Sequence, residues 1–184
     1  MGIPTITELT RDSKNYKHIV EEMVRVEKKV FPKHESLARS FQDELRKKNC
    51  GLLYSQIDGE LVGYVMYCWP SCLLASINKL VVKDKYRRHG HGEALLRAAI
   101  EKCRTRNIQR ICLHVDPLRT SAVSLYQKIG FKVDELIECY YSSDRNAYKM
   151  NGCSSFKVNS LWVILFREKD LRQHTSLIIV FRSM

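Results

Sequence analysis

The stretch Tyr86–Leu96, which reads YRRHGHGEALL, has the residue types and the spacing to bind an anion. Arg87, Gly90 and Gly92 form the pattern Arg-x-x-Gly-x-Gly between an apolar run and a helical pattern. Glycines let the backbone approach a ligand closely, and the free N–H groups of a first helical turn attract negative charge. Arg87 and Arg88 add positive charge beside them. The stretch therefore predicts a bound pyrophosphate.

Two common phosphate-binding patterns are excluded here. The chain has no Gly-Lys-Ser/Thr, which nucleotide hydrolases require. It also lacks the third glycine and the later acidic residue of the dinucleotide-binding pattern. A charged surface turn before an amphipathic helix remains the simpler interpretation of the glycines alone, so the choice depends on the sequence that follows.

The surrounding pattern predicts an α/β fold with a mixed sheet of about seven strands and about four helices. Strands are expected at Ile3–Leu9, Gly51–Ile57, Leu61–Trp69, Leu73–Val82, Gln109–Val115, Phe131–Tyr141 and Ala147–Met150. Helices are expected from Asp12 or Ser13 to Val30, from Ser36 through Leu45, from the glycine turn to Arg106, and over Ser121–Ile129. Asp58-Gly59 predicts a hairpin, and the strand–helix–strand unit around the glycine turn implies a parallel strand pair.

Length and charge restrict the classes of protein. A chain of 184 residues suits one domain. The net charge of +11 suits an anionic ligand, but the basic residues are spread along the chain and indicate no specific nucleic acid. No apolar run has membrane-spanning length, and we expect no secretory signal, so no membrane partner is predicted.

The seven cysteines are irregularly spaced and include no Cys-x-x-Cys pair. We therefore expect reduced thiols, a cytoplasmic or nuclear location and no zinc. His89 and His91 lie two apart without a third ligand in view, so we predict no metal site.

A family resemblance follows from two stretches together. RRHGHG, the later SAVSLYQKIGF and the order of elements are similar to the GNAT superfamily of acetyl-CoA-dependent N-acetyltransferases, over roughly Ile3 to Met150. Within it the chain resembles protein N-terminal acetyltransferases of the ribosomal-protein, NatA and NatE types. Three features carry this second likeness: Phe31-Pro32, Leu113-His114-Val115, and Tyr140-Tyr141 in the last hairpin.

The resemblance implies a site for acetyl-CoA. It assigns the pyrophosphate to Arg87, Arg88, Gly90, His91, Gly92 and Glu93. It assigns the pantetheine arm and acetyl carbonyl to the backbone of Leu80 and Val82, beside a bulge that splays two strands. The family usually has Asn seven residues before Tyr126, whereas this chain has Arg119, which could instead reach a phosphate.

The resemblance also indicates the catalytic groups. His114 matches a catalytic His of NatE-type enzymes and could accept the proton of an α-amine, whose pKa is about 7.7–8.0. Tyr126 could donate a proton to the leaving thiolate. The simpler alternatives are a structural histidine and a tyrosine packed between helix and sheet.

The acceptor entrance would be lined by Phe31, Pro32, Tyr140 and Tyr141. Simple core burial is the alternative for Phe31. NatE-type enzymes have a catalytic Tyr where this chain has Ser76, which cannot do the same work. Asn78 could contact the substrate backbone.

These residues favour direct acetyl transfer from acetyl-CoA to the N-terminal α-amine of a protein or peptide. Two alternatives stay open: a small-amine acetyltransferase, and a non-catalytic acetyl-CoA-binding subunit suggested by Ser76 and Arg119. An auxiliary subunit and association with the ribosome also stay open as partners.

The expected domain covers residues 3–150, and residues 151–184 form an extension outside the family pattern. The extension contains the apolar hexamers Leu161–Phe166 and Ser176–Phe181, each too short to span a membrane. A docked hairpin, a partner-binding segment and a variant C-terminus are the alternatives, of which we favour the last.

Overall fold

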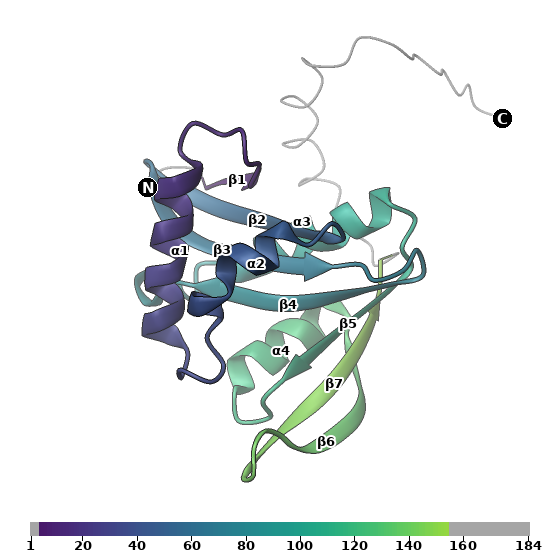
Figure 1. Cartoon of the computed structure of the whole chain (residues 1–184). Coiled ribbons are helices and arrows are strands. Elements are labelled where there is room, and N and C mark those ends of the chain that lie inside the picture. The colour runs from purple at the N-terminus through teal and green to yellow at the C-terminus, as the bar shows by residue number, and fades with distance from the viewer. Residues whose placement is uncertain (1–3, 155–184) are drawn as a thin grey trace, which may run out of the picture.

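Seven strands form one sheet in the order β1-β2-β3-β4-β5-β7-β6 in the computed structural model, which describes residues 4–154 (Figure 1). The β4–β5 pair is parallel, and the other neighbouring pairs are antiparallel. The predicted mixed α/β fold and its parallel pair are confirmed. The β6–β7 hairpin extends away from the rest of the sheet, at the bottom of Figure 1.

The strands are β1 Thr5–Glu8, β2 Cys50–Ile57, β3 Glu60–Cys68, β4 Leu74–Val82, β5 Arg110–Val115, β6 Lys132–Ser142 and β7 Arg145–Cys153. The α-helices are α1 Tyr16–Val30, α2 Phe41–Arg46, α3 His91–Thr105 and α4 Thr120–Ile129. Short 3₁₀ helices span η1 Leu37–Arg39 and η2 Asp84–Tyr86. No helix within residues 4–154 is long and apolar enough to cross a membrane.

Two predicted helix starts were wrong. The hydroxyl of Ser13 donates to the Thr10 carbonyl at 2.9 Å, so residues near 13 form a turn and α1 begins only at Tyr16. Ser36 does act as a cap, because its Oγ accepts from the Ala38 amide at 3.2 Å. It caps η1, however, and α2 starts separately at Phe41.

The hairpin turn and the helix end that were predicted from glycines are confirmed. Asp58 and Gly59 both have positive φ, at 50° and 82°, as a tight two-residue hairpin needs. Gly130 ends α4 with φ of 110°. At the other end of the domain, β7 continues to Cys153, three residues beyond the predicted Met150. The hexamers Leu161–Phe166 and Ser176–Phe181 lie outside the described residues.

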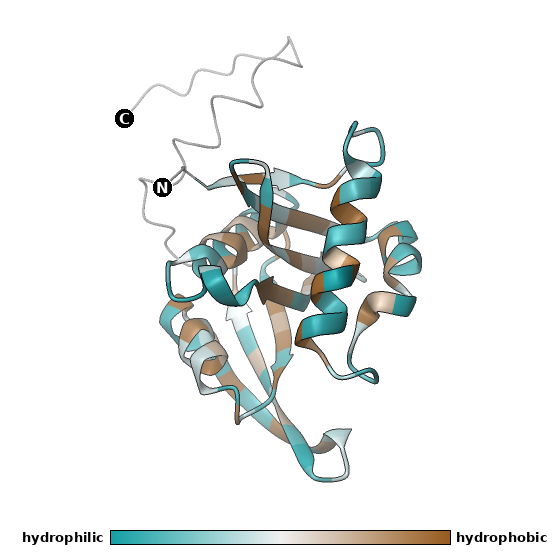
Figure 2. Cartoon of the chain, turned by 90° about the vertical axis from the view of Figure 1, so that its left-hand side faces the viewer, coloured by the Kyte–Doolittle hydropathy of each residue, from teal (hydrophilic) through white to brown (hydrophobic). Residues whose placement is uncertain are grey.

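Alternate residues of β2 and β3 enter two different cores, so the sheet is buried on both faces. Leu53 and Val65 join the core beneath α3 and α4. Leu52 and Met66 join the core beneath α1 and α2. In Figure 2 the central strands behind α1 are mostly brown, whereas α1 carries bands of teal and brown, as an amphipathic helix does.

Irregular pairing changes which face several side chains occupy. Between β3 and β4, Tyr67 pairs with Ile77 but Met66 pairs with Lys79, so Asn78 is an extra residue in β4. A bulge of this kind bends its strand and reverses the alternation of side chains beyond it. The sheet thus changes geometry where β4 approaches the glycine turn.

Glu27 is a fully buried carboxylate, with a relative exposure of 0%, near the end of α1. It accepts a hydrogen bond from the Tyr64 hydroxyl and another, at 2.8 Å, from the Leu37 amide. Burial, with the adjacent charge of Glu27, raises the pKa of Tyr64 well above its usual value. Glu27 therefore joins α1, β3 and η1, and fixes both ends of the loop at 31–36.

The expectation that all cysteines are reduced was wrong for one pair, since Cys50 and Cys68 form a disulfide. A regular two-residue hairpin at Asp58-Gly59 would place Cys50 opposite Tyr67. The register shift between Ser55 and Gln56 places Cys68 there instead, with the two Cα atoms 4.0 Å apart. The sequence does not reveal that shift.

Removing this crosslink should destabilise the oxidised protein. We expect Cys68→Ser to lower the free energy of unfolding by up to about 3 kcal/mol, because a crosslink across 18 residues limits the unfolded chain. Urea titration with and without dithiothreitol measures the difference. The exposed thiol of Cys72 provides the control Cys72→Ser. Equal stability of Cys68→Ser and the parent chain without reductant would contradict the disulfide.

Candidate functional site

The pairing of β4 and β5 stops before either strand ends. The ladder joins Leu74–Ile77 to Arg110–Leu113, whereas β4 continues to Val82 and β5 continues to Val115. The bulge at Asn78 lies where the pairing ends. Beyond it the facing backbone edges of the two strands are free to bind a ligand.

The glycine turn lies at the end of β4 and begins α3. Arg88 and Gly90 have positive φ, at 66° and 82°, and Gly90 is the N-cap residue. The first amide to bond back into the helix is that of Ala94, at 3.0 Å from the Gly90 carbonyl. The amides of residues 91–93 therefore point out of the helix end, as anion binding requires.

The packing around Gly92 leaves room on the ligand side. A Cβ at this position would meet the nearest side chains, Leu125 and Val82, only at 3.5 and 3.6 Å, which is ordinary contact. The chain itself therefore tolerates a larger residue here. Close approach of an external group is a physical reason for glycine.

The charged side chains of the turn bind other residues of the turn and the neighbouring helices. Arg87 donates to the Val82 carbonyl at 3.1 Å and pairs with Asp84 at 2.8 Å. Glu93 accepts from Lys128 of α4 at 2.7 Å and from Arg97 at 2.9 Å, and the bonds from Lys128 and Arg97 lower its pKa. These contacts fix the turn and the distance between α3 and α4.

His91 faces inward from the same turn. Its ring lies edge-on to Tyr86, with centroids 6.0 Å apart. Burial, together with the neighbouring His89, lowers the pKa of His91. A neutral His91 therefore stands among the predicted pyrophosphate ligands.

His114 lies in β5 beyond the paired segment, opposite Lys149 of β7. Its ring stacks on Tyr140, with centroids 4.7 Å apart and planes at 12°. Burial, and then the charge of Lys149, lowers the pKa of His114, while Glu135 opposes this shift. The imidazole is therefore neutral near pH 7 and able to accept a proton.

Tyr140 and Tyr141 reach the same site because β6 is irregular. The register of the hairpin shifts between Ile137 and Ser142, and Cys139 has positive φ of 53°. Neighbours on a regular strand point to opposite faces. Here the two tyrosine rings touch edge to face at 4.9 Å, one stacking on His114 and the other lying 5.3 Å from the Arg145 guanidinium.

Four charged residues from three segments form a cluster beside these rings, which we call the carboxylate–arginine cluster: Glu35, Asp116, Arg119 and Arg145. Arg119 donates to Glu35 at 3.0 Å. Arg145 bonds to Glu35 and, at 2.6 and 3.0 Å, to Asp116. The carboxylates are buried, with side-chain exposures of 7% and 6%. Burial opposes ionisation of Asp116, but the Arg145 bonds prevail and its pKa is lowered.

Phe31 connects this cluster to β4. Arg119 lies over its ring at 5.3 Å and Lys79 at 3.8 Å, while the Pro32 carbonyl accepts the Glu35 and Ser36 amides. Tyr126 of α4 also lies close to this cluster, because the charges of Tyr141 and Arg119 both affect its pKa. Burial is the main reason that the pKa of Tyr126 rises to about 12.

Ser76 and Asn78, the two uncharged polar residues of β4, are near the disulfide. Ser76 donates to Asn78 at 2.7 Å, and the Asn78 amide donates to the Cys68 sulfur at 3.4 Å. They lie at the end of the β4–β5 ladder. The structure thus places one group of predicted residues at the α3 turn and a second around His114 and Phe31, with Ser76 and Asn78 beside the disulfide at the end of the β4–β5 ladder.

Sequence reasoning missed three members of the second group as site residues, namely Glu35, Lys79 and Arg145. Asp116 was interpreted only as the end of a strand. No short spacing pattern in the sequence identifies these residues, because their hydrogen-bond partners lie 29 to 110 positions away. An acidic residue after Phe31-Pro32 and an arginine in the last hairpin were the available signals.

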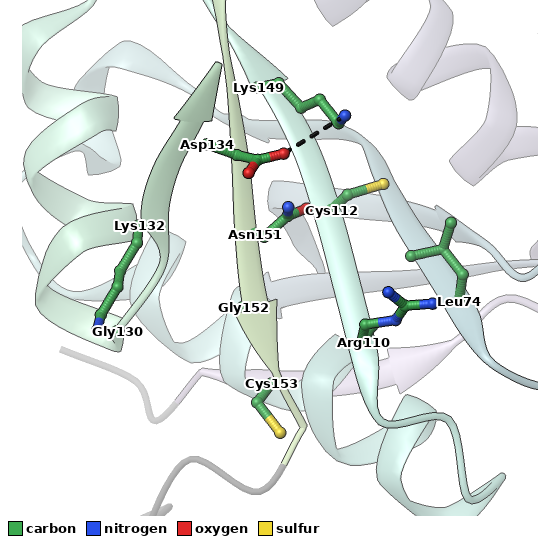
Figure 3. A pocket seen from close by; sticks show the side chains of 10 residues that line it. All are labelled: Leu74, Arg110, Cys112, Gly130, Lys132, Asp134, Lys149, Asn151, Gly152 and Cys153. Atoms are coloured by element: carbon green, nitrogen blue, oxygen red, sulfur yellow. Dashed lines mark ion pairs between the residues drawn. The ribbon is translucent and has the colours of Figure 1, made fainter.

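A cavity of about 630 Å³ lies on the open face of β5 and β7, near the start of β4. Its walls include Leu74, Arg110, Cys112, Asn151 and Lys149, whose ammonium pairs with Asp134 at 3.4 Å (Figure 3). None of the predicted site residues lines it. The described part of the chain contains no group of His, Cys, Asp or Glu arranged for a metal ion. The splay between β4 and β5 is therefore the stronger candidate site.

Comparison with known proteins identifies the family and the fold. Residues 16–131 match the family described as "Acetyltransferase (GNAT) family". The N-alpha-acetyltransferase of Sulfurisphaera tokodaii is 28% identical over 143 residues, covering 71% of this chain and 85% of that protein. The crystal structure of Ard1 from Thermoplasma volcanium has a TM-score of 0.71 at 25% identity, covering 82% and 97% of the two chains. The ribosomal-protein-S18-alanine N-acetyltransferase of Escherichia coli shares the fold, with a TM-score of 0.72 at 19% identity over 86% and 98%.

The carboxylate–arginine cluster should contribute measurably to stability. We expect Arg145→Met to lower the free energy of unfolding by about 3 kcal/mol, because it leaves two buried carboxylates without their shared cation. The exposed Arg104, which pairs with Glu101 one helical turn away, provides the control. Arg104→Met should change stability by less than about 0.5 kcal/mol. Similar values for both variants in urea titrations would show that the cluster is not stabilising.

Proposed function

This chain belongs to the acetyltransferase (GNAT) family, and on that premise we propose that it transfers the acetyl group of acetyl-CoA to the N-terminal α-amine of a protein or peptide. The relative from Sulfurisphaera tokodaii, named for N-alpha acetylation, supports this acceptor. The observation that carries the proposal is the splay of β4 and β5, with an anion-binding helix end and a neutral histidine at the same opening.

The coenzyme side of the splay fits a phosphorylated cosubstrate. When bound, acetyl-CoA supplies an acetyl thioester, which an amine can attack. The residues proposed to hold it are Leu80, Val82, Arg87, Arg88, Gly90, His91, Gly92, Glu93, Arg119 and Tyr126. The free amides at the start of α3 would receive the pyrophosphate, and the unpaired edge of β4 would receive the pantetheine arm.

The acceptor side is formed by the loop at 31–36 and the β6–β7 hairpin. The carboxylate–arginine cluster joins the two segments, because Glu35 binds Arg119, which lies over Phe31, and Arg145, which lies over Tyr141. We assign Pro32 and Tyr140, the neighbours of these two rings, to the same entrance. Backbone groups and tyrosine hydroxyls at such an entrance suit a peptide N-terminus. Ser76 and Asn78 lie on β4 at the end of its ladder with β5 and complete the proposed acceptor set.

We assign His114 as the base that accepts the proton of the acceptor amine, directly or through a water. Its position on the free end of β5 and its neutral imidazole suit this role. An α-amine needs only a weak base, since its own pKa is about 7.7–8.0.

We assign Tyr126 as the acid. Its hydroxyl is protonated at neutral pH, with a pKa that burial raises to about 12, and it can donate a hydrogen bond to a thiolate leaving group. The contact between Arg119 and Glu35 suggests that Arg119 orders the acceptor loop as well as the coenzyme, instead of replacing the usual asparagine directly.

The proposed reaction fits a place of action in the cytoplasm, where newly made N-termini are available, and also in the nucleus. Assistance by an auxiliary subunit or by the ribosome is compatible with the +11 charge, because ribosomal RNA is an acidic surface. Both remain proposals about partners.

One assay tests the proposed acceptor. Purified chain and acetyl-CoA are incubated with peptides bearing free N-termini, with a lysine peptide blocked at its N-terminus, and with small amines. We expect turnover only where a free peptide α-amine is present. Turnover of small amines alone would favour a small-amine enzyme, and tight coenzyme binding without any turnover would favour a non-catalytic subunit.

The pH dependence tests His114. Protonation of the acceptor amine, with its pKa of about 7.7–8.0, lowers kcat/KM once as pH falls. We expect the parent chain to show a second, steeper fall, the acidic limb, as pH drops through the pKa of His114, below about 6.5, because only the neutral ring accepts a proton. His114→Gln should lower kcat at pH 7 by about 100-fold and abolish this acidic limb, leaving the fall due to the amine. Steady-state kinetics between pH 5 and 9 with a fixed peptide measures both. An unchanged acidic limb in the variant would exclude His114 as the base.

A further inference from the structure

The bulge in β4 turns Lys79 to the acceptor side of the sheet. Without it, residue 79 would follow Ala75 and Ile77 into the core beneath α3 and α4. The extra residue, Asn78, reverses the alternation, so Lys79 pairs with Met66 and lies on the side of Val81, beneath α1 and α2. The Lys79 side chain thus reaches the loop at 31–36 from the face of the sheet that α1 and α2 cover.

The ammonium group of Lys79 lies against the proposed acceptor wall. It donates to the Glu35 carbonyl at 2.6 Å and lies 3.8 Å from the centre of the Phe31 ring. The Arg119 guanidinium lies over the same ring at 5.3 Å. Two cations therefore flank the aromatic surface on which the first acceptor residue would lie.

The carboxylates near Lys79 are already engaged elsewhere. Glu35 binds two arginines, and Glu27 is fully buried with its own two donors. Lys79 forms no ion pair within the described part of the chain, although both carboxylates lie close enough to favour its charge. Burial nevertheless prevails and lowers the pKa of Lys79.

An ammonium has three donors, and the carbonyl of Glu35 uses one of them. The remaining donors of this partly buried cation can bind water or a ligand, and a carboxylate supplies both acceptors and the opposite charge, which water does not. We propose that Lys79 selects acceptors whose first residue is Asp or Glu. This inference rests on the proposed acetylation of peptide α-amines.

A purely structural role makes a different prediction. If Lys79 only ties β4 to the loop at 31–36, its replacement should affect all peptides to the same degree. Selection by charge instead predicts a loss confined to acidic peptides. Comparison of acidic residues with their amides separates the two, because Asp and Asn, or Glu and Gln, have nearly the same shape.

The experiment compares kcat/KM for short peptides that differ only in a first residue of Asp, Asn, Glu or Gln. We expect the parent chain to prefer each acid over its amide by about tenfold, equivalent to about 1.4 kcal/mol. Lys79→Met keeps the apolar stem but removes the charge, and it should abolish that preference by lowering kcat/KM about tenfold more for the acidic peptides than for their amides. Thermal unfolding checks that the variant is folded.

Lys28→Met is the matched control, because it removes one positive charge from an exposed position in α1. It should keep the preference for acidic peptides. Amide peptides used as well as acidic ones, or an acid preference that survives Lys79→Met, would overturn the role of Lys79 alone. Failure of all four peptides, with coenzyme bound, would overturn the proposed function as well.

Discussion

The loop at 31–36 is held by two buried carboxylates, and the acceptor half of the site depends on both. Glu27 accepts from Tyr64 and from the Leu37 amide, which fixes the loop to the core beneath α1. Glu35 binds Arg119 and Arg145, which fixes the loop to the far side of the splay. Buried charges are costly unless every oxygen is satisfied, so the loop has one favourable position.

The register shifts decide which residues can act together. A one-residue shift in β4 moves Lys79 from a core position to the proposed acceptor wall. A shift in β2–β3 places Cys68 opposite Cys50, and a longer irregularity in β6 brings Tyr140 and Tyr141 to one place. Each is a local departure from alternation, and those in β4 and β6 lie beside the site, where bulges are often found.

The sequence predicted the features that depend on neighbouring residues, and it missed those that depend on residues far apart in the chain. The glycine turn, the Asp58-Gly59 hairpin and the end of α4 at Gly130 depend on neighbouring residues, and they were predictable. The disulfide and the facing of Lys79 depend on register, which alternating patterns do not determine. The carboxylate–arginine cluster joins positions as distant as Glu35 and Arg145, so no spacing pattern in the sequence predicts it.

The two halves of the site therefore differ in how they are built. Most of the coenzyme side is one continuous segment, the end of β4 and the start of α3, to which the α4 end adds Arg119 and Tyr126; its backbone amides suit any pyrophosphate. The acceptor side is assembled from the loop at 31–36, β4, β5, the start of α4 and the last hairpin through side-chain contacts. Side chains on separate segments can change one at a time without disturbing the coenzyme turn. The chemistry can thus be read from a short stretch, whereas the choice of acceptor depends on contacts such as Lys79 with Phe31 that only the fold creates.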